Sequence, residues 1–320
     1  MSSVNIETRT FLLPSSVSYS EVVHRTDYSK KIVFLTLNRP NRCNALSLEL
    51  LDSLLAHLEE IAKNPQYQIL ILNGNGRHFC SGLDLHEAVL KEEVLISKED
   101  ANLFPNELER KSFFRFVKNS NDDKSSKTNA VAQGYWMPHR LLEILLLLKK
   151  MPQFVIAAVH GAAYGGGAGI VAACDFVLAS HDFRLSFPEL KYGLPPSLLF
   201  PFFRRKIAPP DFRRAVLTSL PIDSQRARDL KLVQEIVSFD ELIPESLEYA
   251  NAFCFGETEI VARTKGMINE SEIPSNDELQ KALAEHWKYW NTPETEERIN
   301  AFFEKRSITS GESTRDSEVI

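Results

Sequence analysis

The sequence VIAAVHGAAYGGGAG at residues 155–169 is followed by IVAACD at residues 170–175. An apolar run leads into five glycines within nine residues, which predicts a buried strand, a tight turn and a helix that begins on bare backbone. The first N–H groups of a helix have no partner within it and lie at its positive dipole end. The stretch therefore predicts either a site for an oxyanion or phosphate, or close packing of the helix on the strand.

The spacing of the glycines excludes two nucleotide-binding motifs. A dinucleotide fingerprint requires G-x-G-x-x-G, but Gly165 and Gly167 are followed by Ile170. A P-loop requires Lys and then Ser or Thr directly after its last glycine, whereas Ile170 and Val171 follow Gly169. What remains is a donor site for an oxyanion that develops during a reaction.

A second stretch has the same organisation. The sequence YQILIL at residues 67–72 runs into NGNG at 73–76 and then FCSGLDL at 79–85. This order predicts another buried strand, a glycine-marked turn and a helix start. We expect the two strand ends, each followed by an exposed N–H group, to converge on one oxygen atom.

These two stretches belong to a set of four motifs along the chain. The set resembles, in content and order, the motifs of the crotonase superfamily, also called the enoyl-CoA hydratase/isomerase family. The similarity runs from about residue 32 to residue 237 and continues more weakly to the C-terminus. It implies an α/β fold, the family's spiral of repeated ββα units, with a C-terminal helical region that forms trimers, often paired into hexamers. The motifs are LNRP at 37–40 with NAL at 44–46, residues 79–84, residues 157–175, and FPE at 187–189 with GL at 193–194.

The resemblance also implies roles for individual residues. The backbone N–H groups of Leu83 and Gly166 would form the oxyanion hole for the thioester carbonyl of an acyl-CoA-like substrate, which makes its α-carbon acidic and its β-carbon electrophilic. Glu189 would be the general acid/base, because a carboxylate desolvated beside an apolar chain has a raised pKa. The substrate-binding positions carried over from the same motifs are Ala45, Ser81, Asp84, Gly165 and Ser197.

One family residue is missing. The better-known hydratases resemble one another in placing two glutamates around a water, and the first of these falls on Gly169. A single glutamate serves the family's isomerases, the 3-methylglutaconyl-type hydratases and the dehydratases of polyketide β-branching cassettes, which residues 187–207 resemble. The 3-hydroxyisobutyryl-CoA hydrolases share the glycine but have an aspartate where this chain has Ser197, which argues against thioester hydrolysis.

These features indicate an enoyl thioester hydratase or dehydratase acting on CoA or on a carrier-protein pantetheine arm. Two alternatives stay open: a double-bond isomerase using the same Glu189, and a non-catalytic homologue that binds acyl thioesters. A second proton donor is left open among Tyr164, Tyr192, Ser197 and His160. The basic run at 204–206 either binds a second substrate carboxylate or is a solvated cluster.

Composition narrows the class of partner. The chain has 320 residues, and 43% of them are hydrophobic. Its formal net charge of −6 argues against nucleic acid as a partner, because nucleic-acid binding usually needs a basic face. Its apolar runs, such as residues 144–148, are far shorter than the roughly 20 residues of a membrane span. The four cysteines form no C-x-x-C pair, and no metal or redox cofactor is implied. We expect a cytoplasmic protein; organellar targeting has only weak support in the N-terminal sequence.

The pattern along the chain predicts four parts. They are a flexible leader (1–18), a core (19–238) with an insertion at about 91–133 that resembles a lid, a helical region (239–306) and a disordered tail (307–320). Within the core we predict a hairpin at 21–37, a helix capped by Ser47 and running to about Lys63, and a helix over 139–150. Three further helices are predicted over 240–255, 276–290 and 292–306.

Overall fold

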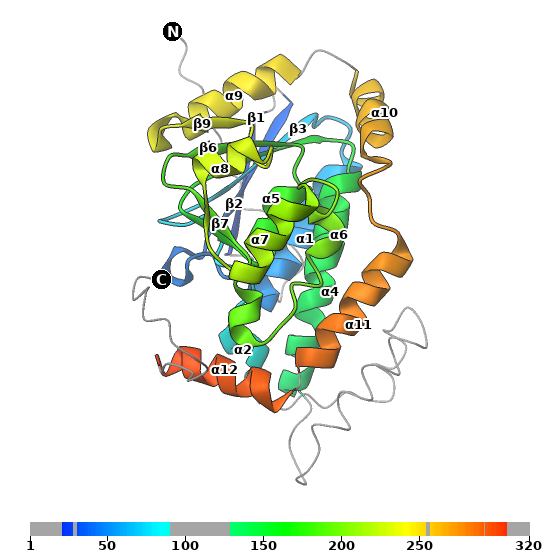
Figure 1. Cartoon of the computed structure of the whole chain (residues 1–320). Coiled ribbons are helices and arrows are strands. Elements are labelled where there is room, and N and C mark those ends of the chain that lie inside the picture. The colour runs from blue at the N-terminus through cyan, green and yellow to red at the C-terminus, as the bar shows by residue number, and fades with distance from the viewer. Residues whose placement is uncertain (1–20, 28–30, 90–128, 254–256, 291, 306–320) are drawn as a thin grey trace, which may run out of the picture.

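The computed structural model describes residues 21–27, 31–89, 129–253, 257–290 and 292–305. Within these ranges the chain folds as an α/β protein with two sheets and helices around them (Figure 1). The predicted leader and tail and almost all of the predicted insertion lie outside the described residues. The lid proposed for the insertion therefore stays a prediction.

The larger sheet has six strands in the order β1-β2-β3-β4-β6-β9, and the smaller has three in the order β5-β7-β8. The predicted hairpin is confirmed, because β1 and β2 pair antiparallel, and every other pair in the larger sheet is parallel. The strands are β1 (Val22–Asp27), β2 (Ile32–Leu37), β3 (Ile69–Gly74), β4 (Phe154–Val159), β5 (Ala162–Tyr164), β6 (Phe176–Ser180), β7 (Arg184–Ser186), β8 (Ile222–Asp223) and β9 (Glu235–Val237).

Both faces of the larger sheet are covered by helices, which explains why its central strands are apolar almost throughout. Side chains alternate along β2, so that Val33 and Leu35 join the main core while Ile32 and Phe34 join a second cluster. The main core also contains α1 (Leu48–Lys63), α4 (Asn129–Lys150) and α5 (Gly166–Ala173). The second cluster is completed by α9 (Leu242–Phe253) on the opposite face.

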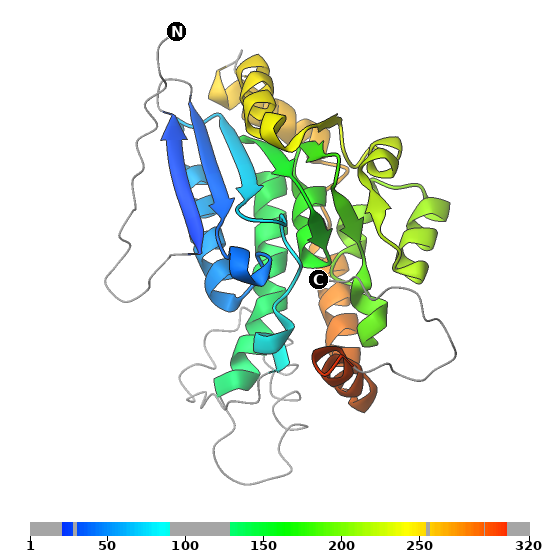
Figure 2. The same ribbon diagram turned by 90° about the vertical axis from the view of Figure 1, so that its left-hand side faces the viewer.

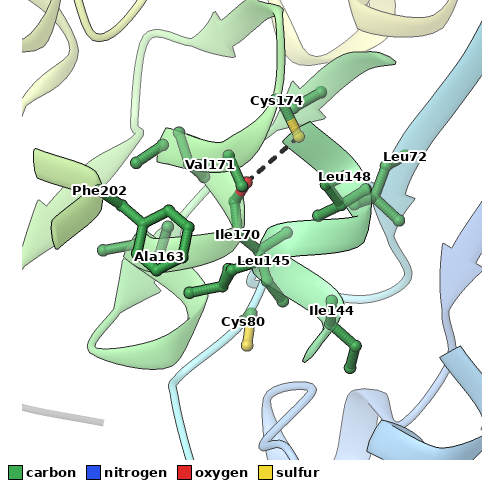
Figure 3. Close-up of a cluster of buried hydrophobic side chains, with 14 of the residues drawn as sticks. Leu72, Cys80, Ile144, Leu145, Leu148, Ala163, Ile170, Val171, Cys174 and Phe202 are labelled. Carbon is green, nitrogen blue, oxygen red and sulfur yellow. Dashed lines mark hydrogen bonds between the residues drawn. The ribbon is translucent and has the colours of Figure 1, made fainter. Parts of the chain in front are cut away.

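Helix α5 lies inside the main core, and all of its residues are buried. Its Ile170 and Val171 lie among Leu145 and Leu148 of α4 and Phe202 of α6 (Figure 3). A helix that is apolar on every side is stable only when it is enclosed in this way. The rigid surroundings fix the N-terminus of α5, where the glycine-rich stretch ends.

The C-terminal helices lie beyond the end of the larger sheet, where Figure 2 shows α11 and α12 in orange to red. Helix α11 packs against α4 and α6, and α12 packs against the segment Pro188–Tyr192. The remaining helices are α2 (Leu85–Val89), α6 (Phe200–Phe203), α7 (Pro209–Thr218), α8 (Ser224–Asp229), α10 (Thr258–Asn269), α11 (Asn276–Trp290) and α12 (Pro293–Phe303), with 3-10 turns at Pro40–Arg42, Pro188–Tyr192 and Phe239–Glu241.

The structure corrects two helix predictions. Helix α4 begins at Asn129 rather than at residue 139 and continues through Pro138. Helix α10 was not predicted; its Lys265 is buried and pairs with Asp175 at 2.6 Å. Within the described ranges, no helix has the length and apolar composition needed to cross a membrane.

Ser47 caps α1 as the sequence predicts, since its Oγ accepts a hydrogen bond from the N–H of Leu50 at 3.1 Å. We expect Ser47→Ala to lower the free energy of unfolding by about 1 kcal/mol, because one N–H of the first helical turn loses its acceptor. Urea denaturation followed by circular dichroism measures this change. Ser47→Thr retains the capping hydroxyl, which also donates to Glu21, and serves as the control; equal stability of the alanine variant and the wild type would contradict the prediction.

Candidate active site

Glu189 is held by a short turn that proline and glycine define at its two ends. The turn is the 3-10 helix Pro188–Tyr192, which follows β7 directly and has Pro188 at its first position, where the fixed φ of proline suits a helix start. Gly193 ends it with φ 77°, a left-handed conformation that favours glycine. The carbonyl of Glu189 accepts a hydrogen bond from the N–H of Leu194 at 3.0 Å. The backbone that carries the carboxyl group is thus fixed on both sides.

The carboxyl group of Glu189 lies in an environment that disfavours its charge. Its Oε2 is buried and has no hydrogen-bond partner among the described residues. Burial raises the pKa of Glu189 to about 7. The neighbouring Tyr192 has its pKa raised to about 12, chiefly by burial and also by the charge of Glu189. A carboxyl group that titrates near neutral pH is suited to take up and release a proton in one reaction cycle.

The N-terminus of α5 lies directly against this carboxyl group. Gly165 precedes the helix with φ 50° and ψ −118°, a conformation that side chains other than glycine rarely adopt. A Cβ atom at this position would lie 3.1 Å from Oε1 of Glu189. Because Gly166 is the first residue of α5, its N–H is one of the groups for which a helix provides no partner. The predicted helix start at the glycine stretch is confirmed.

The segment with Leu83 reaches the same place, two residues before the start of α2. Leu83 pairs with Leu46 in an isolated parallel bridge, in which Leu46 N–H donates to Gly82 and Asp84 N–H donates to Leu46. In such a bridge the N–H of Leu83 itself points to the opposite side. A Cβ atom built on Gly82 would lie 3.6 Å from the backbone nitrogen of Gly166. Helix α2 begins at Leu85, within the stretch 79–85 for which a helix start was predicted, and the expected convergence with Gly166 is supported.

Asn44 holds together the loops that place Leu83. It is fully buried and has a positive φ of 52°. Its Oδ1 accepts from the N–H of Arg39 at 2.7 Å, and its Nδ2 donates to the carbonyls of Asn75 and His78 at 2.9 and 2.8 Å. One side chain thus ties the loop after β2 to the loop after β3. This explains why the two motifs occur together in the sequence.

These segments surround a cavity of about 630 Å³. Seven of the eight residues that the sequence analysis singled out line it, namely Ala45, Ser81, Leu83, Asp84, Gly165, Gly166 and Glu189.

Ser197 is the eighth residue; it is buried, but it does not line the cavity. The carboxylate of Asp84 pairs with Arg39 at 2.5 Å and accepts a hydrogen bond from the N–H of His86 at 3.0 Å, so the partners of this carboxylate belong to the protein scaffold.

Among the candidates for a second proton donor, Tyr164 and Tyr192 line the cavity. His160 does not, because its Nε2 bonds the carbonyl of Gly76 at 2.9 Å.

The basic run at 204–206 does not reach the cavity. Arg204 and Arg205 both pair with Glu278 of α11. Lys206 lies near the carbonyl of Cys174, where burial lowers its pKa to about 8. The hypothesis that this run binds a substrate carboxylate is therefore not supported.

The C-terminal helices supply cavity residues that the sequence analysis did not identify. His286 and Trp290 come from α11, and Arg298, Phe302 and Phe303 come from α12. The only sequence signal for them is the helical spacing of His286 and Trp290, which marks one face of α11 without saying what it covers. Among the described residues, no group of three or more acidic, His or Cys side chains is placed to hold a metal ion.

Gly169 is buried, and the space beside it is filled by leucines. A Cβ atom there would lie 2.8 Å from Cδ2 of Leu199 and 3.2 Å from Cδ1 of Leu145. The place of the family's first glutamate is thus occupied by apolar side chains from the residue that precedes α6 and from α4. The packing around residue 169 therefore leaves no space for a glutamate side chain.

Restoring the missing carboxylate should therefore fail. We expect Gly169→Glu to lower the free energy of unfolding by about 1–3 kcal/mol through overpacking, and not to raise any hydration activity. Thermal denaturation and turnover assays measure the two effects, and Gly169→Ala separates the steric effect of a Cβ atom from that of the carboxylate. A stable Gly169→Glu protein with faster hydration would contradict the prediction, because it would show that Leu145 and Leu199 can move to accommodate the glutamate.

The chain matches a family model described as enoyl-CoA hydratase/isomerase over residues 32–311. Since this match covers most of the sequence, the chain belongs to the enoyl-CoA hydratase/isomerase family, within the crotonase superfamily. Its similarity to "Enoyl-CoA hydratase domain-containing protein 3, mitochondrial" of Danio rerio is 28% identity, over 85% of this chain and 82% of the relative. The 2,3-dehydroadipyl-CoA hydratase of Escherichia coli is 24% identical, over 87% of this chain and 94% of the relative.

Other relatives carry a different activity in their names. The peroxisomal Delta(3,5)-Delta(2,4)-dienoyl-CoA isomerase of Arabidopsis thaliana is 27% identical, over 66% of this chain and 67% of the relative. An enoyl-CoA hydratase structure from Bacillus halodurans aligns with a TM-score of 0.70 at 21% identity, covering 88% of this chain and all of that one. The fold is thus that of the family, whereas hydratases and isomerases both stand among the relatives.

Proposed function

We propose that the protein is an enoyl thioester hydratase or dehydratase that uses one carboxyl group, Glu189. The observation that carries the proposal is the position of this carboxyl group. It is desolvated, it lies against the N-terminus of α5 beside Gly165, and it lines the cavity of about 630 Å³. Because residue 169 is a glycine, it adds no second carboxylate. In this proposal every proton of the reaction therefore passes through Glu189.

The proposed chemistry divides between backbone and side chain. The N–H groups of Leu83 and Gly166 hold the thioester oxygen, where negative charge develops as an enolate forms. In hydration, the Glu189 carboxylate takes a proton from water, whose oxygen bonds to the β-carbon. The resulting Glu189 carboxyl then gives that proton to the α-carbon. Dehydration is the reverse, and Tyr164 and Tyr192 on the cavity wall offer hydroxyl groups to a water.

Double-bond isomerisation is the second candidate, because it needs the same two elements and no water. Glu189 would take a proton from the γ-carbon and return it to the α-carbon while the thioester oxygen is held. The observation that favours this candidate is the leucine-filled space at Gly169, since the two-glutamate arrangement for a water is not available there.

Positively charged residues around the cavity suit the phosphate groups of CoA or of a carrier-protein pantetheine arm. Arg42 and Lys191 are exposed, and the partly buried Arg298 lines the same cavity. Phosphate oxygens bind such side chains through charge-assisted hydrogen bonds. The carrier thus binds at the rim and the acyl chain inside.

Incubation in D₂O with a panel of enoyl-CoA substrates, including crotonyl-CoA and 3-methylglutaconyl-CoA, tests the proposal by mass spectrometry. A gain of one water supports the hydratase, and a moved double bond or deuterium uptake without added water supports the isomerase. Glu189→Gln is the control for both. Thioester binding without any conversion, on CoA and on acylated carrier protein alike, would indicate a non-catalytic homologue and overturn the proposal.

A further inference from the structure

Helix α11 has one buried face, and His286 is a polar side chain on it. Leu279, Leu283 and Trp290 lie on the same face at helical spacing, and His286 is only 4% exposed. Positions with this spacing on a core-facing helix are normally apolar. A histidine here calls for a partner that the apolar face does not provide.

The surroundings of the imidazole are aromatic. It stacks on Trp290 with a centroid distance of 5.1 Å and an interplanar angle of 29°, and it meets the ring of Trp287 edge-on at 5.1 Å. The Nε2 atom of His286 is buried and has no hydrogen-bond partner among the described residues. Buried polar atoms without a partner are rare in folded proteins, and each calls for an explanation such as a water or a ligand.

His286 also lines the cavity that contains Glu189. Leu141, Leu199 and Trp290 share the wall with it. Leu141 connects this wall to the oxyanion donors, because a Cβ atom on Gly166 would lie 3.1 Å from its Cδ2. The imidazole is thus a polar group within an otherwise apolar part of the site.

We propose that His286 hydrogen-bonds an uncharged oxygen, a hydroxyl or a carbonyl, on the acyl part of the thioester, an inference that rests on the proposed function. The preferred substrates are then acyl thioesters that carry such an oxygen beyond the β-carbon, where Glu189 does not account for it. An all-carbon chain leaves Nε2 unpaired, and a site built around a polar group discriminates against ligands that lack its partner.

The charge state of the ring supports an uncharged partner. Burial lowers the pKa of His286 to about 3, and the nearby His139 lowers it further, so the imidazole is neutral at pH 7. A neutral imidazole has one N–H donor and one acceptor nitrogen, which match a hydroxyl group in either direction. A protonated ring would instead favour a carboxylate.

Binding of saturated acyl-CoA thioesters tests the inference without requiring turnover. Hexanoyl-CoA is compared by calorimetry with derivatives that carry a hydroxyl group at C4, C5 or C6. We expect at least one derivative to bind the wild-type protein on the order of 10-fold more tightly than hexanoyl-CoA, the effect of one well-placed hydrogen bond. The same difference is expected in kcat/KM for the corresponding enoyl substrates.

Three variants isolate the nitrogen. His286→Phe keeps the aromatic volume and removes the hydrogen-bonding atoms, so it should abolish the preference for the hydroxylated ligand while leaving hexanoyl-CoA binding within about 3-fold of wild type. His286→Gln places an amide near the position of Nε2 and should restore part of the preference. Glu285→Gln, on the exposed side of the same helix, should leave both affinities unchanged.

The outcomes separate this inference from the proposed function. Equal binding of hexanoyl-CoA and all hydroxylated derivatives to the wild type would overturn the role of His286, as would an equal loss for both in folded His286→Phe. Hydroxyl selectivity without conversion of any enoyl substrate would overturn the proposed hydratase alone. Thermal denaturation of each variant shows whether it is folded.

Discussion

Glu189→Gln should reduce kcat/KM for the preferred enoyl thioester by about 10²- to 10⁴-fold, the usual contribution of a general acid/base. The substitution replaces one oxygen by an amide group of similar size and leaves nothing able to carry the proton. Substrate affinity should change little, because the proposed oxyanion donors are backbone groups at Leu83 and Gly166. Steady-state kinetics with a competitive binding assay measures both quantities. No other carboxyl group is proposed to take over the proton, so we expect no partial rescue at high pH.

The pH dependence gives the same prediction an independent readout. Burial raises the pKa of Glu189 to about 7, and the proposed reactions begin with its carboxylate form. For the wild type, kcat/KM should therefore rise with pH and level off above about pH 7. The Glu189→Gln protein should lose this dependence in its residual activity.

Two controls distinguish a catalytic loss from misfolding. The buried Oε2 has no hydrogen-bond partner among the described residues, so the neutral glutamine should leave thermal stability at pH 8 equal to or slightly above that of the wild type. Glu294→Gln, an exposed position on α12, should keep full activity. A Glu189→Gln enzyme with normal stability and more than half of the wild-type activity would show that another group moves the proton.

The segments around Glu189 and the two glycines could be singled out from the sequence, because each has a local backbone signal. Glycines at 82 and 165 adopt positive φ angles, and Pro188 and Gly193 begin and end the turn that holds Glu189, so each segment has its own backbone signal. The resemblance then brought these distant segments together. The helix start predicted in the stretch 79–85 is found at Leu85, whereas the bridge between Leu83 and Leu46 is a non-local pairing that no periodicity reveals.

The part of the cavity that the C-terminal helices form was not predictable in this way. Leu141 of α4, the two leucines at positions 198 and 199 before α6, and residues of α11 and α12 line it, although they lie far apart in the chain. Amphipathic spacing indicates that His286 and Trp290 face inward, but not whether they face the core or a cavity. Helix α4 was predicted too short because Pro138 usually marks a helix start, yet here it lies inside a helix that tertiary packing stabilises.

Gly166→Pro should have the second large effect, because it removes one oxyanion donor while keeping the other. Proline is well tolerated at the first position of a helix, so α5 itself should persist. The loss of one such donor typically lowers kcat by about 10²- to 10³-fold. The residual activity should keep the pH dependence set by Glu189, since the general acid/base is intact.

The ring of proline also adds atoms, and Gly166→Ala is the matched control for that. A Cβ atom at 166 would lie 2.9 Å from Cδ1 of Leu46 and 3.1 Å from Cδ2 of Leu141, both ends of flexible side chains that can shift. The alanine variant keeps the N–H, so the steric effect of a Cβ atom appears in both variants and the loss of the donor in only one. If the two variants lose activity equally while both stay folded, the N–H of Gly166 does not stabilise the oxyanion. A further loss of at least 10-fold in the proline variant would instead assign the missing stabilisation to that single donor, since about 1.4 kcal/mol corresponds to a factor of ten.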